Sequence, residues 1–214
     1  MEALTKPNSL DFEPAPPADP RACARTLARL AAGLEVRAPG INGHSRRVSR
    51  YAAGIARRMG LPREQVARVR QAAAVHDIGK LEMPARIVNK PGPLSDEEFT
   101  QVQRHAAAGE RMVAGLGDEQ LSAIVRHHHE RVDGAGYPDG LVGAEIPLGA
   151  RIVAVADTFD ALTSTRPYRP ASNHRDALVL LGAEAGAQLD PDVVRAFRDY
   201  YSGFRGVLAR LFAR

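Results

Sequence analysis

The chain has a single cysteine, Cys23, and no tryptophan among its 214 residues. One thiol excludes an intramolecular disulfide framework and favours a reducing compartment. No apolar run approaches the roughly 20 residues that a membrane-spanning helix needs. The first residues, MEALTKPNSLDFEP, are acidic and polar and do not resemble a secretory signal. The sequence therefore predicts a cytoplasmic protein without a transmembrane segment.

Aromatic residues are also scarce, at 5% of the chain, whereas hydrophobic residues make up 44%. Leucine, valine, isoleucine and alanine must therefore fill the core. A composition rich in alanine and poor in strand formers favours an all-α fold. The net charge is only +4, and no stretch concentrates it into a basic tail. This balance suits an anionic ligand and argues against a nucleic-acid polymer as the partner.

Prolines and apolar periodicity divide the chain into four parts. Five prolines within residues 1–20 predict a disordered or extended arm. Residues 21–42 are expected to form an N-terminal helix and a linker, and residues 43–203 the main domain. Residues 204–214 are a short, basic, amphipathic tail. We expect this tail to pack against the domain, with contact to a membrane surface as the alternative.

Apolar spacing and helix-end signals predict the helices. Ser95 and Glu98 form a capping-box pattern that opens one of them. The segment ARIVAVADTFDALT could begin as a buried strand, but its length and alanines favour a helix. Long loops are expected at 79–94 and 134–148, where prolines and glycines interrupt the pattern. The expected helices are 21–37, 44–59, 62–77, 95–114, 118–131, 150–163, 173–185 and 192–201.

Potential metal ligands are distributed over these helices. Each has a plain alternative role when it is considered alone, for example as a helix cap or an exposed side chain. A helical bundle can nevertheless bring one such group from each helix to a common centre. Imidazoles and carboxylates without thiolates suit a divalent transition metal such as iron, manganese or zinc rather than a structural zinc site. The candidates are His44, His76, Asp77, His105, His127, His128, His129 and Asp157.

The adjacent pair His76–Asp77 ends a helix whose other face is apolar. An unpaired buried aspartate is costly, so Asp77 is expected to need a cation. Consecutive helical residues point about 100° apart. If the last helical turn is loosened, both side chains can reach one site. Because a carboxylate has two oxygens, Asp77 could bridge two metals.

Several motifs occur together in one order: GHSRRV, HDIGK, NKPGPLSDEEF, HHERVDGAGYPDGL, RIVAVADTFDALTSTRPYR and LDPDVV. They span about residues 43–197 and resemble the HD-GYP subfamily of the HD phosphohydrolase superfamily. The resemblance implies an HD-domain bundle of about seven helices with a GYP loop, and a stand-alone catalytic domain over residues 43–203. It also implies a metal-dependent phosphodiesterase that hydrolyses cyclic di-GMP to pGpG and/or GMP, with a bridging hydroxide as the nucleophile.

The same resemblance implies a site of two divalent metal ions, with iron or manganese as first candidates and other ions possible. A third ion is not expected, because Gly40 stands where some members have a glutamate. Lys80 is implied as a catalytic phosphate contact, and Arg166 and Arg169 as contacts to phosphate or guanine. The role of His127 stays open. One ion is assigned to His44, His76, Asp77 and Asp157, and the other to Asp77, His105, His128 and His129.

The segment Gly136–Tyr137–Pro138 either fixes the geometry of a tight loop or contacts a protein partner. In the family this loop is linked to GGDEF-domain and other signalling proteins, and Tyr137 is expected to be exposed. Two alternatives to a cyclic di-GMP phosphodiesterase remain open at this point. One is a non-catalytic module that binds a cyclic dinucleotide or a protein. The other is an HD hydrolase of another nucleotide.

Overall fold

The computed structural model describes residues 25–27, 29–33, 43–165 and 171–212, with side chains described as far as Gly203. This part of the chain contains two isolated bridges and no β-strand, so the all-α prediction is confirmed. Residues 25–27 and 29–33 are helical. The elements that follow are α2 (His44–Arg58), α3 (Arg63–Val75), η2 (Ile78–Glu82), α4 (Ala85–Val88), α5 (Asp96–Gln103), α6 (His105–Ala114), α7 (Glu119–His127), η3 (Gly143–Glu145), α8 (Leu148–Thr163), α9 (His174–Ala183) and α10 (Pro191–Phe212).

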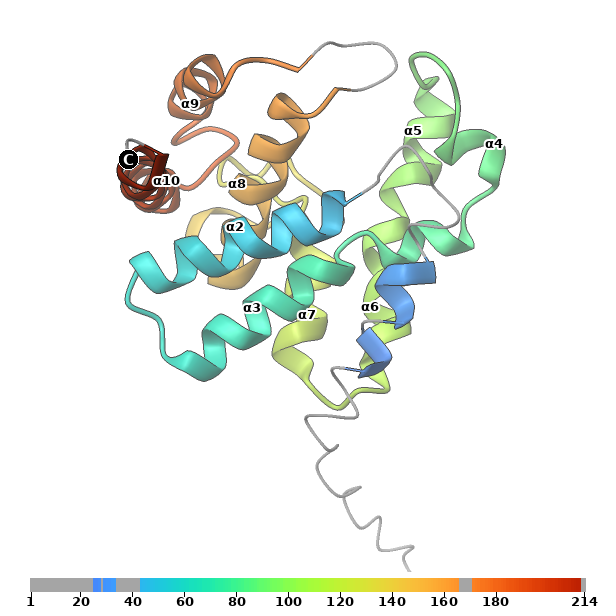
Figure 1. Ribbon diagram of the computed structural model, residues 1–214. Helices are drawn as coiled ribbons and strands as arrows, with labels where there is room; N and C mark the ends of the chain where they lie inside the picture. Colours follow the sequence, from blue (N-terminus) through green and yellow to red (C-terminus); the bar gives the residue numbers. More distant parts are fainter. Residues whose placement is uncertain (1–24, 28, 34–42, 166–170, 213–214) are drawn as a thin grey trace, which may run out of the picture.

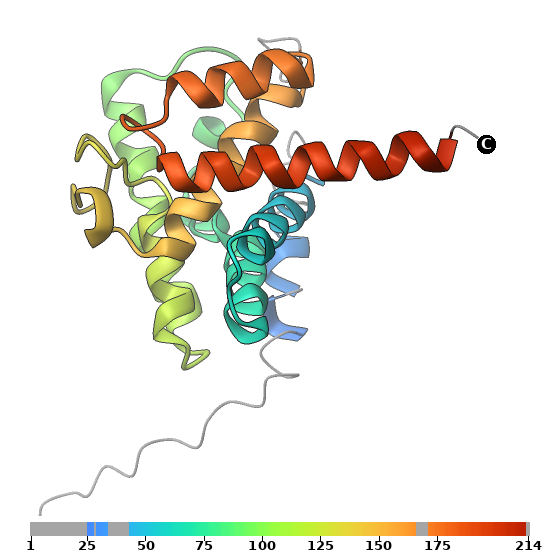
Figure 2. The ribbon, with the colours of Figure 1, turned by 90° about the vertical axis from the view of Figure 1, so that its left-hand side faces the viewer.

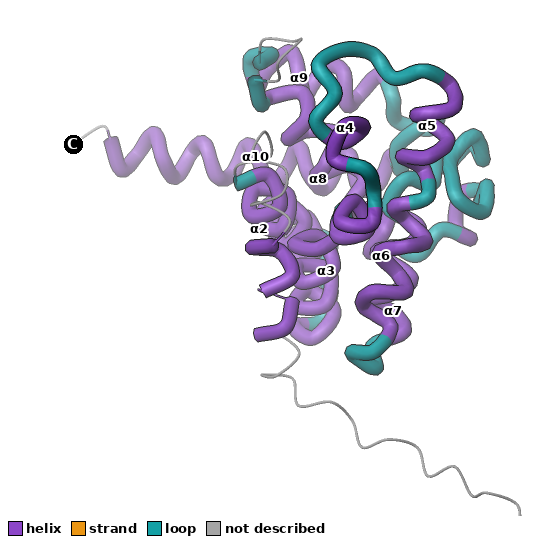
Figure 3. Tube along the Cα trace, turned by 90° about the vertical axis from the view of Figure 1, so that its right-hand side faces the viewer, coloured by secondary structure: helices purple, strands orange, loops and turns teal. Residues whose placement is uncertain are grey.

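Helices α2 and α3 lie side by side, and α7, α8 and α10 pack around them (Figure 1). The longer loops, including the connection from α4 to α5, lie on the side of the bundle away from α10 (Figure 3). Figure 2 shows that α10 extends well beyond the rest of the bundle. No helix of the described residues combines the length and apolarity that a membrane span requires.

Small residues allow the central helices to approach closely. A Cβ added at Gly54 of α2 would lie 2.3 Å from the Tyr200 ring of α10, and one at Gly149 of α8 would lie 2.4 Å from Ile124 of α7. Alanines of α2, α3 and α8 are also buried in the core. Aliphatic side chains fill most of the core, as expected. Phe159, Phe197 and Tyr201 add an aromatic cluster between α8 and α10 that composition did not predict.

The helix ends differ from the expected ones in four places. The helix expected at 118–131 ends at His127, so His128 and His129 follow it. The helix expected at 95–114 is divided at Arg104 into α5 and α6, although its Ser95–Glu98 capping box is present as expected. The loop expected at 79–94 contains η2 and α4. The last helix does not end at Tyr201 but continues to Phe212, because no proline interrupts its hydrogen-bond ladder.

The division between α5 and α6 is where the η2 segment packs against the bundle. A Cβ added at Gly79 would lie 2.0 Å from the carbonyl oxygen of His105, the first residue of α6. Only glycine allows this approach between two backbones. The contact places Asp77, just before η2, close to His105.

Candidate metal centre

The pair His76–Asp77 lies where α3 changes into a 3-10 turn. His76 is the C-cap of α3, and Asp77 is the N-cap of η2 with φ −91° and ψ 6°. The loosened turn expected from the sequence is therefore present. It places His76 Nε2 3.6 Å from Asp77 Oδ2, with both side chains almost fully buried. Two neighbouring residues can thus direct polar atoms to one centre.

Three other helices bring imidazoles to Asp77 from different directions. His44 is the first residue of α2, and its Nε2 lies 4.0 Å from Asp77 Oδ2. His105 begins α6, and its Nε2 lies 3.3 Å from Asp77 Oδ1. His128 is the C-cap of α7, and its Nε2 lies 3.3 Å from His105 Nε2. The helix ends, rather than the helix faces, supply most of this cluster.

The tautomers of four histidines leave Nε2 free to bind a cation. Nδ1 of His76, His105 and His128 donates to the carbonyl oxygen three residues earlier, at 2.6–2.8 Å. Nδ1 of His44 donates to Asp160 Oδ2 at 2.8 Å. A carbonyl or carboxylate oxygen accepts only, so the proton is on Nδ1 and Nε2 presents a lone pair to the cluster. This arrangement is typical of metal-binding histidines.

The ligand atoms form two groups that share Asp77. In each group the atoms lie within 4.8 Å of one another; one group is Asp77, His105, His128 and His129, and the other is His44, His76 and Asp77. Asp157 of α8 borders the second group, with Oδ1 3.3 Å from His44 Nε2 and 4.0 Å from His76 Nε2. The structure therefore brings together all seven residues for which a ligand role was predicted.

Two buried atoms at the centre have no hydrogen-bond partner among the described residues. They are His76 Nε2 and Asp77 Oδ1; the 3.3 Å approach of His105 Nε2 to Asp77 Oδ1 is not a hydrogen bond, because its nitrogen carries no proton. Leaving such groups unpaired in a protein interior costs free energy. A cation between the imidazoles and the shared carboxylate would satisfy both atoms, so the donor set fits divalent metal ions.

For Asp77 and three of the histidines, the electrostatics favour the protonation state that a metal requires. Burial lowers the pKa of His129 to about 3. Burial also lowers the pKa values of His128 and His76. Burial would raise the pKa of Asp77, but Lys80 and the neighbouring imidazoles outweigh it and hold this pKa well below its usual value. Neutral imidazoles and an ionised carboxylate are the metal-binding forms.

His127 is turned away from the cluster. Its Nδ1 donates to the carbonyl oxygen of Ala123 at 2.9 Å, and its Nε2 lies 2.8 Å from Asp139 Oδ2. Asp139 also accepts two hydrogen bonds from Arg126. His127 therefore holds the loop after α7 rather than facing the shared aspartate, which favours His128 and His129 as the ligands from this run.

The loop after α7 is fixed by Glu130, which sequence reasoning missed. This carboxylate is buried and accepts backbone hydrogen bonds from Asp139, Gly140 and Leu141 at 2.7–3.1 Å. Gly136 lies against the same segment, because an added Cβ would come within 2.4 Å of the Arg131 backbone nitrogen. Glutamate directly after three histidines gives no sequence signal for such a role.

Tyr137 was expected to be exposed, and this expectation is wrong. The side chain is half-buried, and its ring stacks on the His129 imidazole with 4.8 Å between centroids and 29° between planes. Its pKa is raised by burial. The cis peptide bond between Tyr137 and Pro138 lies in the same loop. The tyrosine thus forms one wall beside the cluster.

Asp160 is a second residue that sequence reasoning missed. It is buried and accepts from His44 Nδ1, and also from Arg47 at 2.6 Å and 3.0 Å. It follows Asp157 by three residues on α8, and this i, i+3 spacing on one helix face was the signal available in the sequence. The carboxylate fixes the orientation of the His44 ring.

Replacement of Asp160 by asparagine is expected to weaken metal binding by about 10–100-fold, because the orienting carboxylate of His44 is lost. Calorimetric titration with Mn²⁺ would measure this change. Asp199→Asn is the matched control, since Asp199 forms an ion pair with Arg58 at a mostly exposed position. Equal Mn²⁺ affinity in Asp160→Asn and the unmodified chain would contradict this role.

Replacement of Glu130 by glutamine is expected to lower the free energy of unfolding by about 1–3 kcal/mol, because an amide NH₂ would face backbone N–H groups that now have an acceptor. Denaturant titration would measure the change. Glu119→Gln, at an exposed position in the first turn of α7, should have little effect. A loss in Glu130→Gln no greater than in this control would show that the carboxylate does not hold the loop.

Of the predicted substrate contacts, only Lys80 is described. Its Nζ donates to Asp77 Oδ2 at 2.6 Å, and the side chain is half-buried. The positive charge therefore lies at the edge of the cluster. Arg166 and Arg169 lie outside the described residues.

The model of the HD domain family matches residues 29–193 of this chain. That match covers well over half of the 214 residues. The chain therefore belongs to the HD-domain family, and the family expected from the motifs is confirmed. Its relatives, described next, are consistent with the HD-GYP branch.

The chain is similar to cyclic-dinucleotide phosphodiesterases. It is 44% identical over 174 residues to the cyclic di-GMP phosphodiesterase response regulator RpfG of Xanthomonas campestris pv. campestris (strain 8004), covering 80% of this chain and 46% of that protein. It is 39% identical over 166 residues to the 3′3′-cGAMP-specific phosphodiesterase 3 of Vibrio cholerae serotype O1, covering 77% of this chain and 36% of that protein.

Among solved structures, a cyclic GMP-AMP-specific phosphodiesterase of Vibrio cholerae, V-cGAP3, superposes with a TM-score of 0.58 at 31% identity. The superposition covers 90% of this chain and 45% of that chain. The chain thus spans less than half the length of each of these three relatives.

Proposed function

We propose that this chain is a phosphoric diester hydrolase that cleaves cyclic di-GMP to pGpG and/or GMP at a centre of two divalent ions. The observation that carries the proposal is the pair of ligand groups that share Asp77, with His76 Nε2 and Asp77 Oδ1 buried and unsatisfied. His44, His76, Asp77 and Asp157 would hold one ion. Asp77, His105, His128 and His129 would hold the other.

Iron and manganese are the first candidates for these ions, because both accept imidazole and carboxylate ligands. When bound, two such ions would lower the pKa of a water so that it can act as the nucleophile, and would neutralise charge on the phosphate. Asp77 orients both sites, and the N–H···O bonds of the histidines hold their rings in place. Lys80 provides a positive charge where the phosphate oxygens become more negative.

A hollow beside the centre offers space for part of the substrate. Its volume is about 530 Å³, within the range of roughly 300–1,000 Å³ that is typical of small-molecule sites. His105 and Tyr137 form part of its wall, Arg104 adds positive charge, and Arg111 of the same lining is paired with Glu82 at 3.0 Å. This position supports a phosphate-bearing substrate next to the ligand cluster. Arg166 and Arg169 as further contacts remain predictions from the motif.

Incubation of the purified chain with Mn²⁺, or anaerobically with Fe²⁺, and cyclic di-GMP tests the proposal. Chromatography should show pGpG and/or GMP, and the Asp77→Asn variant should form them at least about 10³-fold more slowly. Absence of turnover with each ion would contradict the enzyme and favour a non-catalytic module that binds the nucleotide or a protein.

A second candidate substrate is 3′3′-cGAMP. It is supported by 39% identity to the 3′3′-cGAMP-specific phosphodiesterase 3 and by 31% identity to the solved cyclic GMP-AMP-specific phosphodiesterase V-cGAP3. Competition between the two cyclic dinucleotides in one reaction would rank them by kcat/KM. Preferential hydrolysis of 3′3′-cGAMP would change the substrate in the proposal and leave the reaction class intact.

Contact of the Gly136–Tyr137–Pro138 loop with GGDEF-domain proteins also remains a prediction. In the described structure the Tyr137 ring stacks on the His129 imidazole. A cytoplasmic location is part of the same proposal, because a chain with one cysteine has no need of an oxidising compartment.

A further inference from the structure

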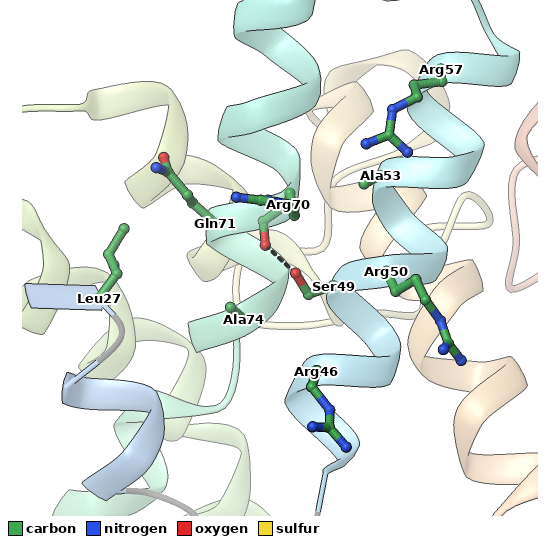
Figure 4. A pocket seen from close by; sticks show the side chains of 9 residues that line it. All are labelled: Leu27, Arg46, Ser49, Arg50, Ala53, Arg57, Arg70, Gln71 and Ala74. Carbon is green, nitrogen blue, oxygen red and sulfur yellow. Dashed lines mark hydrogen bonds between the residues drawn. The ribbon is translucent and has the colours of Figure 1, made fainter. Parts of the chain in front are cut away.

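A hollow between α2 and α3 is lined mainly by arginines. Its volume is about 390 Å³, and its lining includes Arg46, Arg50 and Arg57 of α2 and Arg70 of α3. Figure 4 shows these side chains around the hollow, with the hydrogen bond from Ser49 Oγ to the Arg70 carbonyl oxygen joining the two helices. None of the seven proposed metal ligands lines it.

The other arginines of the same two helices have carboxylate partners. Arg47 pairs with Asp160, Arg58 with Asp199, and Arg68 with Asp118 and Glu64. The sequence of α2 contains no carboxylate, and that of α3 contains only Glu64.

The four arginines of the hollow differ from these neighbours. None of them forms an ion pair with a described residue; Arg50 instead lies over the Tyr51 ring, 5.2 Å from its centroid. The positive charge is therefore concentrated and locally uncompensated. Like charges held together on a folded surface repel one another, so an anion would bind there favourably.

The chemistry of the lining points to phosphate groups. All four cations are arginines, whose planar guanidinium groups bind phosphate oxygens with two parallel hydrogen bonds. Leu27 and Ala53 are buried and supply an apolar surface beside them. A concave site with a few charged groups and an apolar wall suits a small ligand better than an extended macromolecule.

We propose that the hollow is a binding site for a small phosphorylated ligand that carries at least two negative charges. The guanidinium groups of α2 and α3 bind the phosphates, and Leu27 and Ala53 contact an apolar ring where the ligand has one. The ligand bridges the two helices whose ends carry His44 and His76. This proposal does not depend on the chain's being an enzyme.

Calorimetric titration of the full chain with inorganic pyrophosphate and with ADP tests this site, because the probes share a diphosphate and differ in the ring. Each titration uses metal-loaded and metal-free protein, since phosphates can also bind at a metal centre. The variant is Arg57→Gln/Arg70→Gln. The matched control is Arg63→Gln, an exposed arginine of α3 that does not line the hollow.

We expect metal-free protein to bind both probes, and affinity to fall with added salt. The double variant should bind at least about 10-fold more weakly, through loss of charge-assisted hydrogen bonds, and Arg63→Gln should bind normally. The melting temperature of the double variant should not fall, because repulsion is removed.

Binding that disappears with the metal, or that the double variant retains, would overturn the site. Binding of an acidic peptide such as tetraglutamate without binding of either phosphate would also overturn it, and would indicate a protein segment as the partner.

Discussion

Asp77→Asn is expected to lose both metal ions and to reduce cyclic di-GMP hydrolysis by about 10³-fold or more, because one carboxylate serves both ligand groups and two-metal activation of water depends on it. Elemental analysis of the protein would give the metal content, and chromatography the rate. The substitution keeps the side-chain shape and removes the charge that Lys80 now neutralises at 2.6 Å.

Asp157→Asn is the matched control for this experiment. Asp157 borders only the group that contains His44 and His76, so its replacement should leave the ion at His105, His128 and His129 in place. Circular dichroism of both variants would verify folding. Two ions and unchanged turnover in Asp77→Asn would contradict the shared position of this residue.

The second large effect is expected from one member of the triple-histidine run and not from its neighbour. His128→Ala should lose the ion held with His105 and should reduce turnover by at least about 10²-fold. His127→Ala should keep both ions, because its ring bonds to Asp139 and the Ala123 carbonyl oxygen, away from the cluster. Metal analysis of the two variants measures the difference directly.

His127→Ala should still cost stability, roughly 0.5–1.5 kcal/mol for its lost hydrogen bonding. Denaturant titration would detect this loss. It would show that the His127 side chain contributes to stability although it does not bind metal. Loss of metal in His127→Ala with retention in His128→Ala would reverse the assignment within this run.

The sequence predicted those features that depend on local signals. The capping box of Ser95 and Glu98 forms as expected, because its bonds lie within four residues. The cluster around Asp77 was predicted partly from polar residues at helix ends and fully assigned only through the resemblance to a family. Spacing alone did not distinguish His127 from His128. The two residues are adjacent, and the direction in which each side chain points depends on where α7 ends, which the sequence did not fix.

Features that depend on distant contacts were missed. Asp160 meets His44 from 116 positions away in the chain, and the burial of Tyr137 depends on how the loop folds back onto His129. The break between α5 and α6 has no proline or glycine at Arg104. It coincides with the close approach of Gly79 to His105. This is a tertiary contact, which helix propensity cannot predict.

A crystal structure of the Mn²⁺-loaded chain, with anomalous scattering used to locate the ions, tests the central claim most directly. The account predicts two anomalous peaks on opposite sides of Asp77, one among His44, His76 and Asp157 and the other among His105, His128 and His129. An absence of peaks at full Mn²⁺ loading, or a peak bound by His127 in place of His128, would contradict it.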